Sequence, residues 1–173
     1  MQILETKRTV LRRLLLSDLD DLYTLYRDPE IRRYFPEGTL SLEETKEELE
    51  WFVAGHPDHP HLGLWATVYK ESGDFVGRCG LLPQMVEGQQ EVEVAFLLSK
   101  AYWGQGLATE VARALVNYAF EHLRLTRLIC MIEPGNLASE KVAKNIGMTL
   151  EKESVDDKGP FLLYSTGKTP QVK

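Results

Sequence analysis

The chain has 173 residues, 43% of them hydrophobic and 27% charged, and a formal net charge of −6. This length suits one domain with a core of its own, and the composition excludes a disordered or fibrous protein. The negative charge argues against a nucleic-acid partner, no apolar run reaches the ~18 residues of a membrane span, and the first residues lack a signal-peptide core. We therefore expect a cytoplasmic protein with one domain over residues 1–167 and a tail at 168–173.

The chain opens with a predicted strand and a predicted helix. Residues 3–14 mix β-branched, apolar and basic side chains, which favours a first or edge strand. Ser17 is placed to cap a helix over residues 17–28, and Pro29 ends that helix.

A second helix is predicted over residues 41–55 by a capping box, a serine and a glutamate three positions apart. In the loop before it, Tyr34 and Phe35 either fill the core or line a cleft for a substrate. Residues 56–61 read His-Pro-Asp-His-Pro-His, where prolines and polar neighbours favour a solvated loop over a metal site. No metal is expected.

Three strands are predicted in the middle of the chain. The segments 63–70 and 75–82 are joined by a short polar turn, and a third strand follows at 91–98, so we expect an antiparallel meander. Cys79 and Cys130 lie in apolar strand-like runs and are expected to be small buried side chains without a disulfide.

A long amphipathic helix follows the third strand. The residues expected on its buried face are Leu107, Val111, Leu115, Tyr118 and His122. A strand at 127–133 comes next, and a strand, a helix and a strand over ~40 residues form a right-handed crossover between parallel strands. Asn136 caps a short helix that Gly147 ends, and a hairpin over 148–155 and 160–167 closes the chain. The order of elements predicts an α/β fold with a mixed, mostly antiparallel sheet.

Gly104 and Gly106 form a glycine turn at the start of the long helix. The first N–H groups of a helix have no partner within it and carry the positive end of its dipole, and glycine lets a phosphate approach the main chain closely. A dinucleotide fingerprint is disfavoured, because Thr109 occupies its third glycine position and Glu133, the candidate ribose carboxylate, comes late. The turn predicts a cofactor that carries phosphates.

Residues 102–110 read Tyr-Trp-Gly-Gln-Gly-Leu-Ala-Thr-Glu, a segment that resembles the acetyl-CoA turn of the GNAT superfamily of N-acetyltransferases. Gly106 and Ala108 match the last two fixed positions of the family pattern, whereas Trp103 stands where glutamine or arginine is usual. The ribosomal-protein N-terminal acetyltransferase branch shares this departure. The resemblance covers nearly the whole chain and implies a GNAT fold and direct transfer of an acetyl group from acetyl-CoA to a primary amine.

The resemblance also implies which residues contact the cofactor. The family's parallel strands splay apart where Phe96 and Leu98 lie, so these residues would pair with the pantetheine arm, and a backbone N–H of the same strand would meet the thioester oxygen. The other residues implied for cofactor binding are Trp103, Gly104, Gln105, Gly106, Leu107, Ala108, Thr109, Asn136 and Ser139.

Glu93 is the candidate general base. It is a carboxylate in an otherwise apolar strand, where loss of solvent raises the pKa toward neutrality. Glu91 shares its face, so the alternative is that both glutamates form the solvated half of an alternating strand. The resemblance favours the catalytic interpretation of Glu93.

Assistance to the leaving sulfur is assigned by the resemblance to Ser139. Many GNAT members have a tyrosine where this chain has Ala143. The ribosomal-protein branch instead has a segment similar to the one from Asn136 to Ser139, whose serine is placed to hydrogen-bond the cofactor sulfur. Both residues also have an ordinary role, as a helix cap and a first-turn residue.

The acceptor is the least defined part of the site. The glutamates of 43–50 would attract a cationic acceptor, although such a run more often forms a solvated helix face. The resemblance favours the N-terminal α-amine of a protein or peptide, entering between the 29–40 loop and Glu93. Small amines such as antibiotics, polyamines or amino acids, and a non-catalytic acyl-CoA-binding module, stay as alternatives, and both a monomer and a homodimer are compatible with the sequence.

Overall fold

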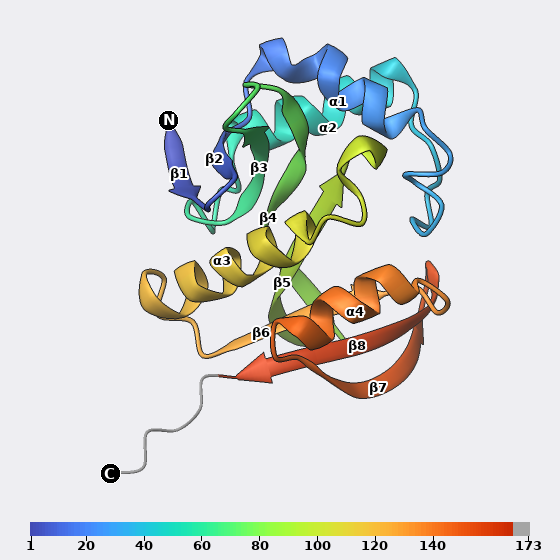
Figure 1. Ribbon diagram of the computed structural model, residues 1–173. Helices are drawn as coiled ribbons and strands as arrows, with labels where there is room; N and C mark the ends of the chain where they lie inside the picture. Colours follow the sequence, from blue (N-terminus) through green and yellow to red (C-terminus); the bar gives the residue numbers. More distant parts are fainter. Residues whose placement is uncertain (168–173) are drawn as a thin grey trace.

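Eight strands form one mixed sheet in the order β1-β2-β3-β4-β5-β6-β8-β7 (Figure 1). The computed structural model describes residues 1–167, and the tail expected at 168–173 lies outside the described residues. The strands are β1 (Gln2–Glu5), β2 (Thr9–Arg13), β3 (Gly63–Tyr69), β4 (Phe75–Val86), β5 (Gln89–Leu98), β6 (Arg127–Ile132), β7 (Thr149–Asp156) and β8 (Gly159–Gly167). The helices are α1 (Leu19–Tyr26), α2 (Leu42–Ala54), α3 (Leu107–Glu121) and α4 (Leu137–Asn145), with 3-10 turns η1 (Leu16–Asp18) and η2 (Lys100–Tyr102).

The predicted meander and crossover are confirmed. Strands β2 to β5 pair antiparallel in sequence order, α3 then crosses the sheet, and β6 lies parallel to β5. The closing hairpin places β8 beside β6 and β7 at the edge. The fold is therefore the mixed α/β fold that the order of elements predicted. In the part of the chain that the structure describes, no helix is both long and apolar enough to cross a membrane.

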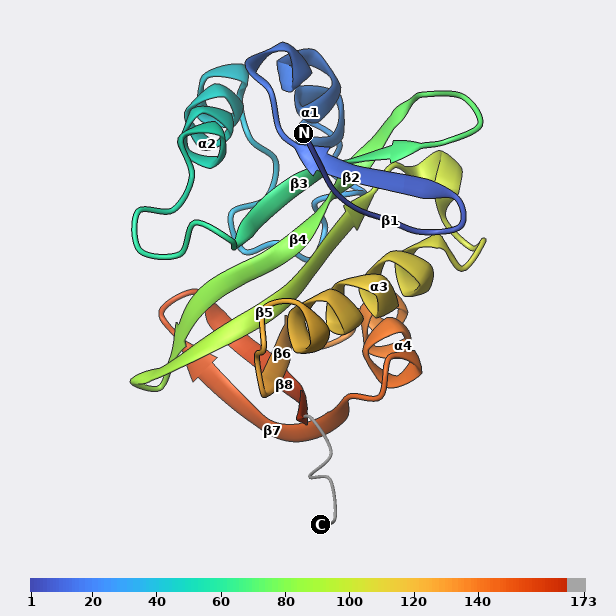
Figure 2. The same cartoon turned by 90° about the vertical axis from the view of Figure 1, so that its left-hand side faces the viewer.

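Helices cover both faces of the sheet (Figure 2). Ala95 and Leu97 of β5 belong to the core under α1 and α2, whereas Val94 and Leu98 belong to the core under α3 and α4. This alternation follows from the two-residue period of a strand. Glu93 has the parity of Ala95 and therefore lies on the α1–α2 face of the sheet.

The N-terminal segment was predicted as one strand over residues 3–14 and is instead the hairpin β1–β2. The backbone N–H of Thr6 donates to the carbonyl of Thr9 at 2.9 Å and closes the turn. Lys70, the residue after β3, also donates to the Thr6 carbonyl, at 2.6 Å, and holds the turn from a second side.

The prediction that Ser17 caps the first helix was wrong. The Asp18 carboxylate accepts the N–H of Leu15 at 2.8 Å and pairs with Arg12 at 2.8 Å, and Ser17 lies inside η1. A carboxylate that serves both a free N–H and a guanidinium forms stronger hydrogen bonds than a serine hydroxyl does.

Strand β4 extends to Val86, four residues beyond the predicted end. Its pairing with β3 ends where Gly63 faces Leu81, so the rest of β4 has a free side. Pro83, opposite Val92 in the ladder with β5, is tolerated there because a strand with a free side needs fewer N–H donors.

The buried stripe of α3 is shorter than predicted. Tyr118 is half-buried, and His122 is exposed because it follows the last residue of the helix as its cap. The predicted residues that are buried are Leu107, Val111 and Leu115.

Two predicted helix caps are confirmed. Ser41 Oγ accepts the N–H of Glu44 at 3.1 Å, and the Glu44 carboxylate accepts the N–H of Ser41 at 2.7 Å. Asn136 Oδ1 accepts the N–H of Ser139 at 3.2 Å, and Gly147 follows α4 with a φ of +90°. These local signals act within one helical turn and so can be identified in the sequence.

Candidate active site

The glycine turn leads from η2 into α3 with its main chain open to solvent. Gly104 and Gly106 have φ angles of +72° and +74°, a conformation that glycine adopts without strain. A Cβ at Gly104 would meet no atom of the described residues within 4 Å, and one at Gly106 would meet only Arg8 Nη2, at 4.0 Å. The turn therefore leaves room for an anion beside the first N–H groups of α3.

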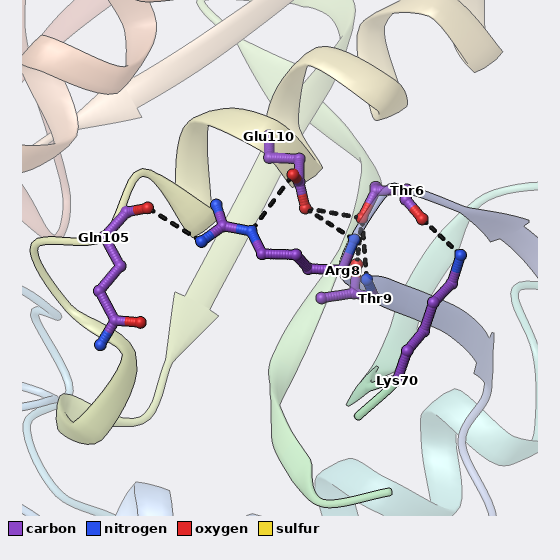
Figure 3. A network of polar contacts seen from close by, with 6 residues as sticks. All are labelled: Thr6, Arg8, Thr9, Lys70, Gln105 and Glu110. Atoms are coloured by element: carbon purple, nitrogen blue, oxygen red, sulfur yellow. Dashed lines mark hydrogen bonds and ion pairs between the residues drawn. The ribbon is translucent and has the colours of Figure 1, made fainter. Parts of the chain in front are cut away.

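Arg8 holds the glycine turn against the N-terminal hairpin (Figure 3). Its Nη1 donates to the carbonyl of Gln105 at 3.1 Å, and its Nε pairs with Glu110 Oε1 at 3.3 Å. Glu110 Oε2 also accepts from the Thr6 hydroxyl at 2.9 Å. Sequence reasoning missed Arg8 because its partner Glu110 lies 102 positions further along the chain.

A hollow of about 730 Å³ lies between α3 and α4 and reaches the glycine turn. Three basic side chains line it: Arg8, Arg113 and Lys141. The Arg113 guanidinium donates to the carbonyl of Asn145 at 2.9 Å and links the two helices. Glu110 also lines the hollow and pairs with Arg8, so among the described residues Arg113 and Lys141 are the two lining cations without a carboxylate partner there. In a chain of net charge −6 this local positive excess suits a ligand with several phosphates. Arg113 and Lys141 were also missed, because only the packing of α4 on α3 brings them together.

Strands β5 and β6 meet at one position and then diverge. Within the described residues the register pairs Glu93 with Ile129 alone, whereas β4 continues to pair with β5 as far as Leu98. The side of β5 toward β6 is therefore open along Phe96 and Leu98, while the Phe96 side chain packs against the α3 core. An extended ligand can add backbone hydrogen bonds along such an open strand edge.

Several predicted cofactor-binding side chains shape the turn itself. Trp103 Nε1 donates to the carbonyl of Leu98 at 3.0 Å, so this tryptophan fixes the end of β5 relative to the turn. Gln105 Nε2 donates back to a carbonyl of η2, and the Leu107 side chain is buried in the core. The predicted residues that line the hollow are Gly104, Gly106, Ala108 and Thr109.

Glu93 lies half-buried where the two strands part. Burial raises the pKa of its carboxyl to about 7, although the Arg78 charge, the backbone of Met131 and the Lys158 charge each favour the ionised form. Glu91, two residues earlier on the same face, accepts from Arg127 Nε at 3.0 Å. The structure therefore separates the two glutamates: Glu91 forms an ion pair, and Glu93 has the pKa of a base that works near neutral pH.

Ser139 lies in the first turn of α4 and is half-buried. Its N–H donates to Asn136, so the ordinary role of this pair as cap and first-turn residue is present. Ala143, where many relatives of this kind have a tyrosine, is fully buried and offers no polar atom. The role of the Ser139 hydroxyl as partner of the cofactor sulfur stays a prediction.

Tyr34 and Phe35, the two predicted acceptor-site residues of the 29–40 loop, have different surroundings. Phe35 packs against the α1–α2 core, and the guanidinium of Arg32 lies 4.1 Å from its ring centre. Tyr34 instead lies beside exposed Arg33, at 5.2 Å. Phe35 therefore faces the interior near β4 and β5, and Tyr34 is further out on the loop.

The turn between β7 and β8 approaches this loop (Figure 1). Lys158 Nζ pairs with Glu37 Oε1 at 2.9 Å, and the Lys158 charge also acts on Glu93. The loop and the hairpin thus flank the region in front of Glu93 from two sides.

The histidine-rich segment 56–61 is a loop stabilised by hydrogen bonds among its own residues. His56 Nδ1 accepts the N–H groups of Asp58 and His59, at 3.1 and 3.2 Å. Among residues 1–167 no group of three or more His, Cys, Asp or Glu side chains is arranged to hold a metal ion.

Comparisons with known proteins agree with this geometry. A family model described as an acetyltransferase (GNAT) domain matches residues 8–149, which include the glycine turn, Glu93 and Ser139. YkkB of Bacillus subtilis, an uncharacterized protein, is 32% identical over 140 residues, which cover 81% of this chain and 80% of that protein. YdaF of Bacillus subtilis, provisionally named a ribosomal N-acetyltransferase, is 31% identical over 80 residues, 45% of this chain and 44% of that protein. The crystal structure of a GNAT-family acetyltransferase from Bacillus anthracis has a TM-score of 0.82 at 21% identity, covering 96% of this chain and 98% of that one.

Proposed function

The chain belongs to the GNAT acetyltransferase family, and on this basis we propose that it acetylates the N-terminal α-amine of a protein or peptide by direct transfer from acetyl-CoA. The observation that carries the proposal is Glu93, a carboxylate with a pKa near 7 at the point where β5 and β6 part. The choice of acceptor is supported by the 102–110 segment and by the similarity to YdaF.

The residues present fit acetyl-CoA. The open glycine turn and the basic hollow suit its phosphates, with Arg8, Arg113 and Lys141 as the charged partners. The free edge of β5 over residues 96–98 suits the pantetheine arm. Acetyl-CoA supplies a thioester, whose acetyl group can be passed to an amine with the sulfur as leaving group.

In the proposed reaction Glu93 removes the proton from the acceptor. An α-amine has a pKa of about 7.7–8.0, so most of it is protonated at pH 7, and a base with a pKa near 7 is closely matched to it. The carbon–nitrogen bond forms as the carbon–sulfur bond breaks. A backbone N–H of residues 96–98 donates to the acyl oxygen, and Ser139 donates a hydrogen bond to the departing sulfur.

The test is a panel of acceptors read by release of free CoA. It contains peptides with a free N-terminus, the same peptides with a blocked N-terminus, spermidine, an aminoglycoside and free amino acids. Turnover of the free peptides but not of the blocked ones supports the proposal. Turnover of the small amines alone would leave an N-acetyltransferase with a different acceptor. If acetyl-CoA raises the melting temperature and no amine turns over, the non-catalytic binding module is the better conclusion.

A further inference from the structure

Two arginines lie almost buried beside the acceptor region. Arg32 of the 29–40 loop is 4% exposed, and Arg78 of β4 is 5% exposed. The Tyr26 ring lies 4.9 Å from the Arg32 guanidinium and 5.5 Å from that of Arg78, and the Phe35 ring lies 4.1 and 5.5 Å from them. Two positive charges thus share the same two aromatic rings.

No carboxylate of the described residues contacts either guanidinium. Within residues 1–167 neither guanidinium forms an ion pair within 4.0 Å, while their Nε atoms donate to Gly38 O and Tyr26 Oη, both at 2.8 Å. The Glu48 carboxylate of α2 acts on both arginines from further away. Glu37 also acts on Arg32, and Arg78 acts on Glu93, so the surrounding carboxylates favour both charges without contacting either guanidinium. A buried guanidinium without a directly bound carboxylate is costly.

The terminal nitrogens of both arginines are free to bind a ligand. The hydrogen bonds that Arg32 and Arg78 make with described residues involve only their Nε atoms. In the described chain, the fully buried polar side-chain atoms that lack a hydrogen bond are Glu48 Oε2 and Thr67 Oγ1. The arginine Nη atoms are not among them, so they keep some contact with solvent. Guanidinium N–H groups with this freedom are suited to a carboxylate, which they can hold through two parallel hydrogen bonds.

Arg78 and Glu93 are close enough to contact one acceptor. Both lie on the α1–α2 face of the sheet, with Arg78 opposite Leu97 and Glu93 opposite Leu82. This offset of four residues separates the two Cα atoms by about 13 Å along the strands, and the two side chains extend over part of that distance. The Arg78 charge already acts on the Glu93 carboxyl across the remaining gap. A molecule with an amine and a carboxylate a few bonds apart can therefore reach both.

We propose that the acceptor carries a carboxylate near its reactive amine, and that Arg32 and Arg78 bind this carboxylate while Glu93 receives the amine proton. The inference rests on the acetyl-transfer part of the proposed function, not on the choice of a peptide as acceptor. Two kinds of acceptor carry such a carboxylate: a peptide with an acidic side chain at its first residue, or a free amino acid with its α-carboxylate. The helix glutamates at 43, 44, 47 and 50 are exposed to solvent, as in a solvated helix face, and so do not require a cationic acceptor.

The experiment compares matched acceptors on the whole chain. One pair is a peptide that begins with aspartate and the same peptide that begins with asparagine; the other is a free amino acid and its amide. The carboxylate is expected to raise kcat/KM by about 10- to 100-fold in one of the pairs, the effect of a hydrogen bond to a charged group. The pair that shows the preference identifies the source of the carboxylate.

Three variants connect the preference to the arginines. Arg32→Gln and Arg78→Gln are expected to bring the ratio of acid to amide close to 1. Arg78→Gln also removes a charge that favours the ionised form of Glu93, so it should slow both acceptors as well, and the ratio is the readout that isolates carboxylate binding. Arg33→Gln, on the exposed side of the same loop, is the matched control and should keep the wild-type ratio. A variant that folds poorly would lower turnover of both acceptors together and weaken acetyl-CoA binding, so it cannot imitate a selective loss of the acidic acceptor. If that happens, the ratio measured on the wild-type protein decides.

The outcomes separate the inference from the function on which it rests. Turnover of amines with no preference for a carboxylate, or a preference that persists in both arginine variants, overturns the inference and leaves the acetyltransferase intact. Absence of CoA release with every acceptor overturns the proposed function and the inference together.

Discussion

Replacing Glu93 by glutamine is expected to lower turnover and, above neutral pH, to stabilise the fold. The amide keeps the shape of the side chain but cannot accept a proton, and removal of a general base typically costs 10²–10⁴-fold in rate. The same carboxyl is held in a position that disfavours its charge, because burial raises its pKa from 4.5 to about 7. The residue proposed as the base thus weakens the folded state above neutral pH.

The magnitude follows from the pKa difference between the folded and unfolded chains. The folded carboxyl keeps its proton to higher pH than the unfolded one, so its ionisation opposes folding once the pH exceeds about 4.5, and the penalty is complete above about 7. One pKa unit corresponds to 1.36 kcal/mol, so the full penalty is about 3 kcal/mol at pH 8 and less than about 1 kcal/mol at pH 5. Glu93→Gln should remove it.

Two assays measure the two effects. Urea unfolding without acetyl-CoA, at pH 5 and pH 8, gives the free energy of unfolding of the wild type and the variant. The rate of CoA release between pH 5.5 and 8.5, corrected for the neutral fraction of the amine, gives a profile of kcat/KM that should rise with an apparent pKa near 7 in the wild type. The variant should be slow and should lack this rise.

Glu91→Gln is the matched control, because Glu91 lies on the same face of β5 but its carboxylate pairs with Arg127. It should keep the wild-type rate profile and, unlike Glu93→Gln, lower the free energy of unfolding, by about 1 to 3 kcal/mol at both pH values. A Glu93→Gln variant with near-wild-type turnover would refute the role as base, and one with no extra stability at pH 8 would refute the raised pKa.

Three further predictions concern the residues around the glycine turn and α4. Lys141→Ala should weaken acetyl-CoA binding about 10- to 100-fold in calorimetry through loss of a charged partner for phosphate, whereas Lys144→Ala, on the same helix but outside the hollow, should bind normally. Ser139→Ala should lower kcat with little change in the Kd of acetyl-CoA, and an unchanged kcat would remove this hydroxyl from the mechanism. Trp103→Phe should lower the free energy of unfolding by about 1 kcal/mol, because it loses the hydrogen bond to the Leu98 carbonyl; equal stability in urea would contradict that role.

Local signals explain what could be predicted from the sequence. The capping box at Ser41, the cap at Asn136 and the glycine turn each depend on residues within a few positions of one another, and all three occur as expected. The predicted cap at Ser17 was wrong because the actual cap depends on a contact with another element. The Asp18 carboxylate pairs with Arg12 of β2 and accepts the hydrogen bond at the start of this turn in place of Ser17.

The candidate site divides in the same way. Glu93 and the turn could be identified because a carboxylate in an apolar strand and glycines before a helix are visible in the chain order. Arg8, Arg113 and Lys141 could not, because their positions around the hollow depend on how the N-terminal hairpin and α4 pack against α3. A side chain on an exposed helix face has the same sequence pattern whether it faces solvent or a ligand.

The amino-acid sequence by itself determined the order of elements after the N-terminal hairpin, the glycine turn before α3 and the presence of a carboxylate in an apolar strand, since these follow from periodicity and from contacts between near neighbours. Only the tertiary structure decided that β5 and β6 part at Glu93, that three cations line one hollow, and that Arg32 and Arg78 meet around Phe35. Each of these features joins residues far apart in the chain, and such contacts arise from the packing of whole elements on one another, for which no single segment carries a signal.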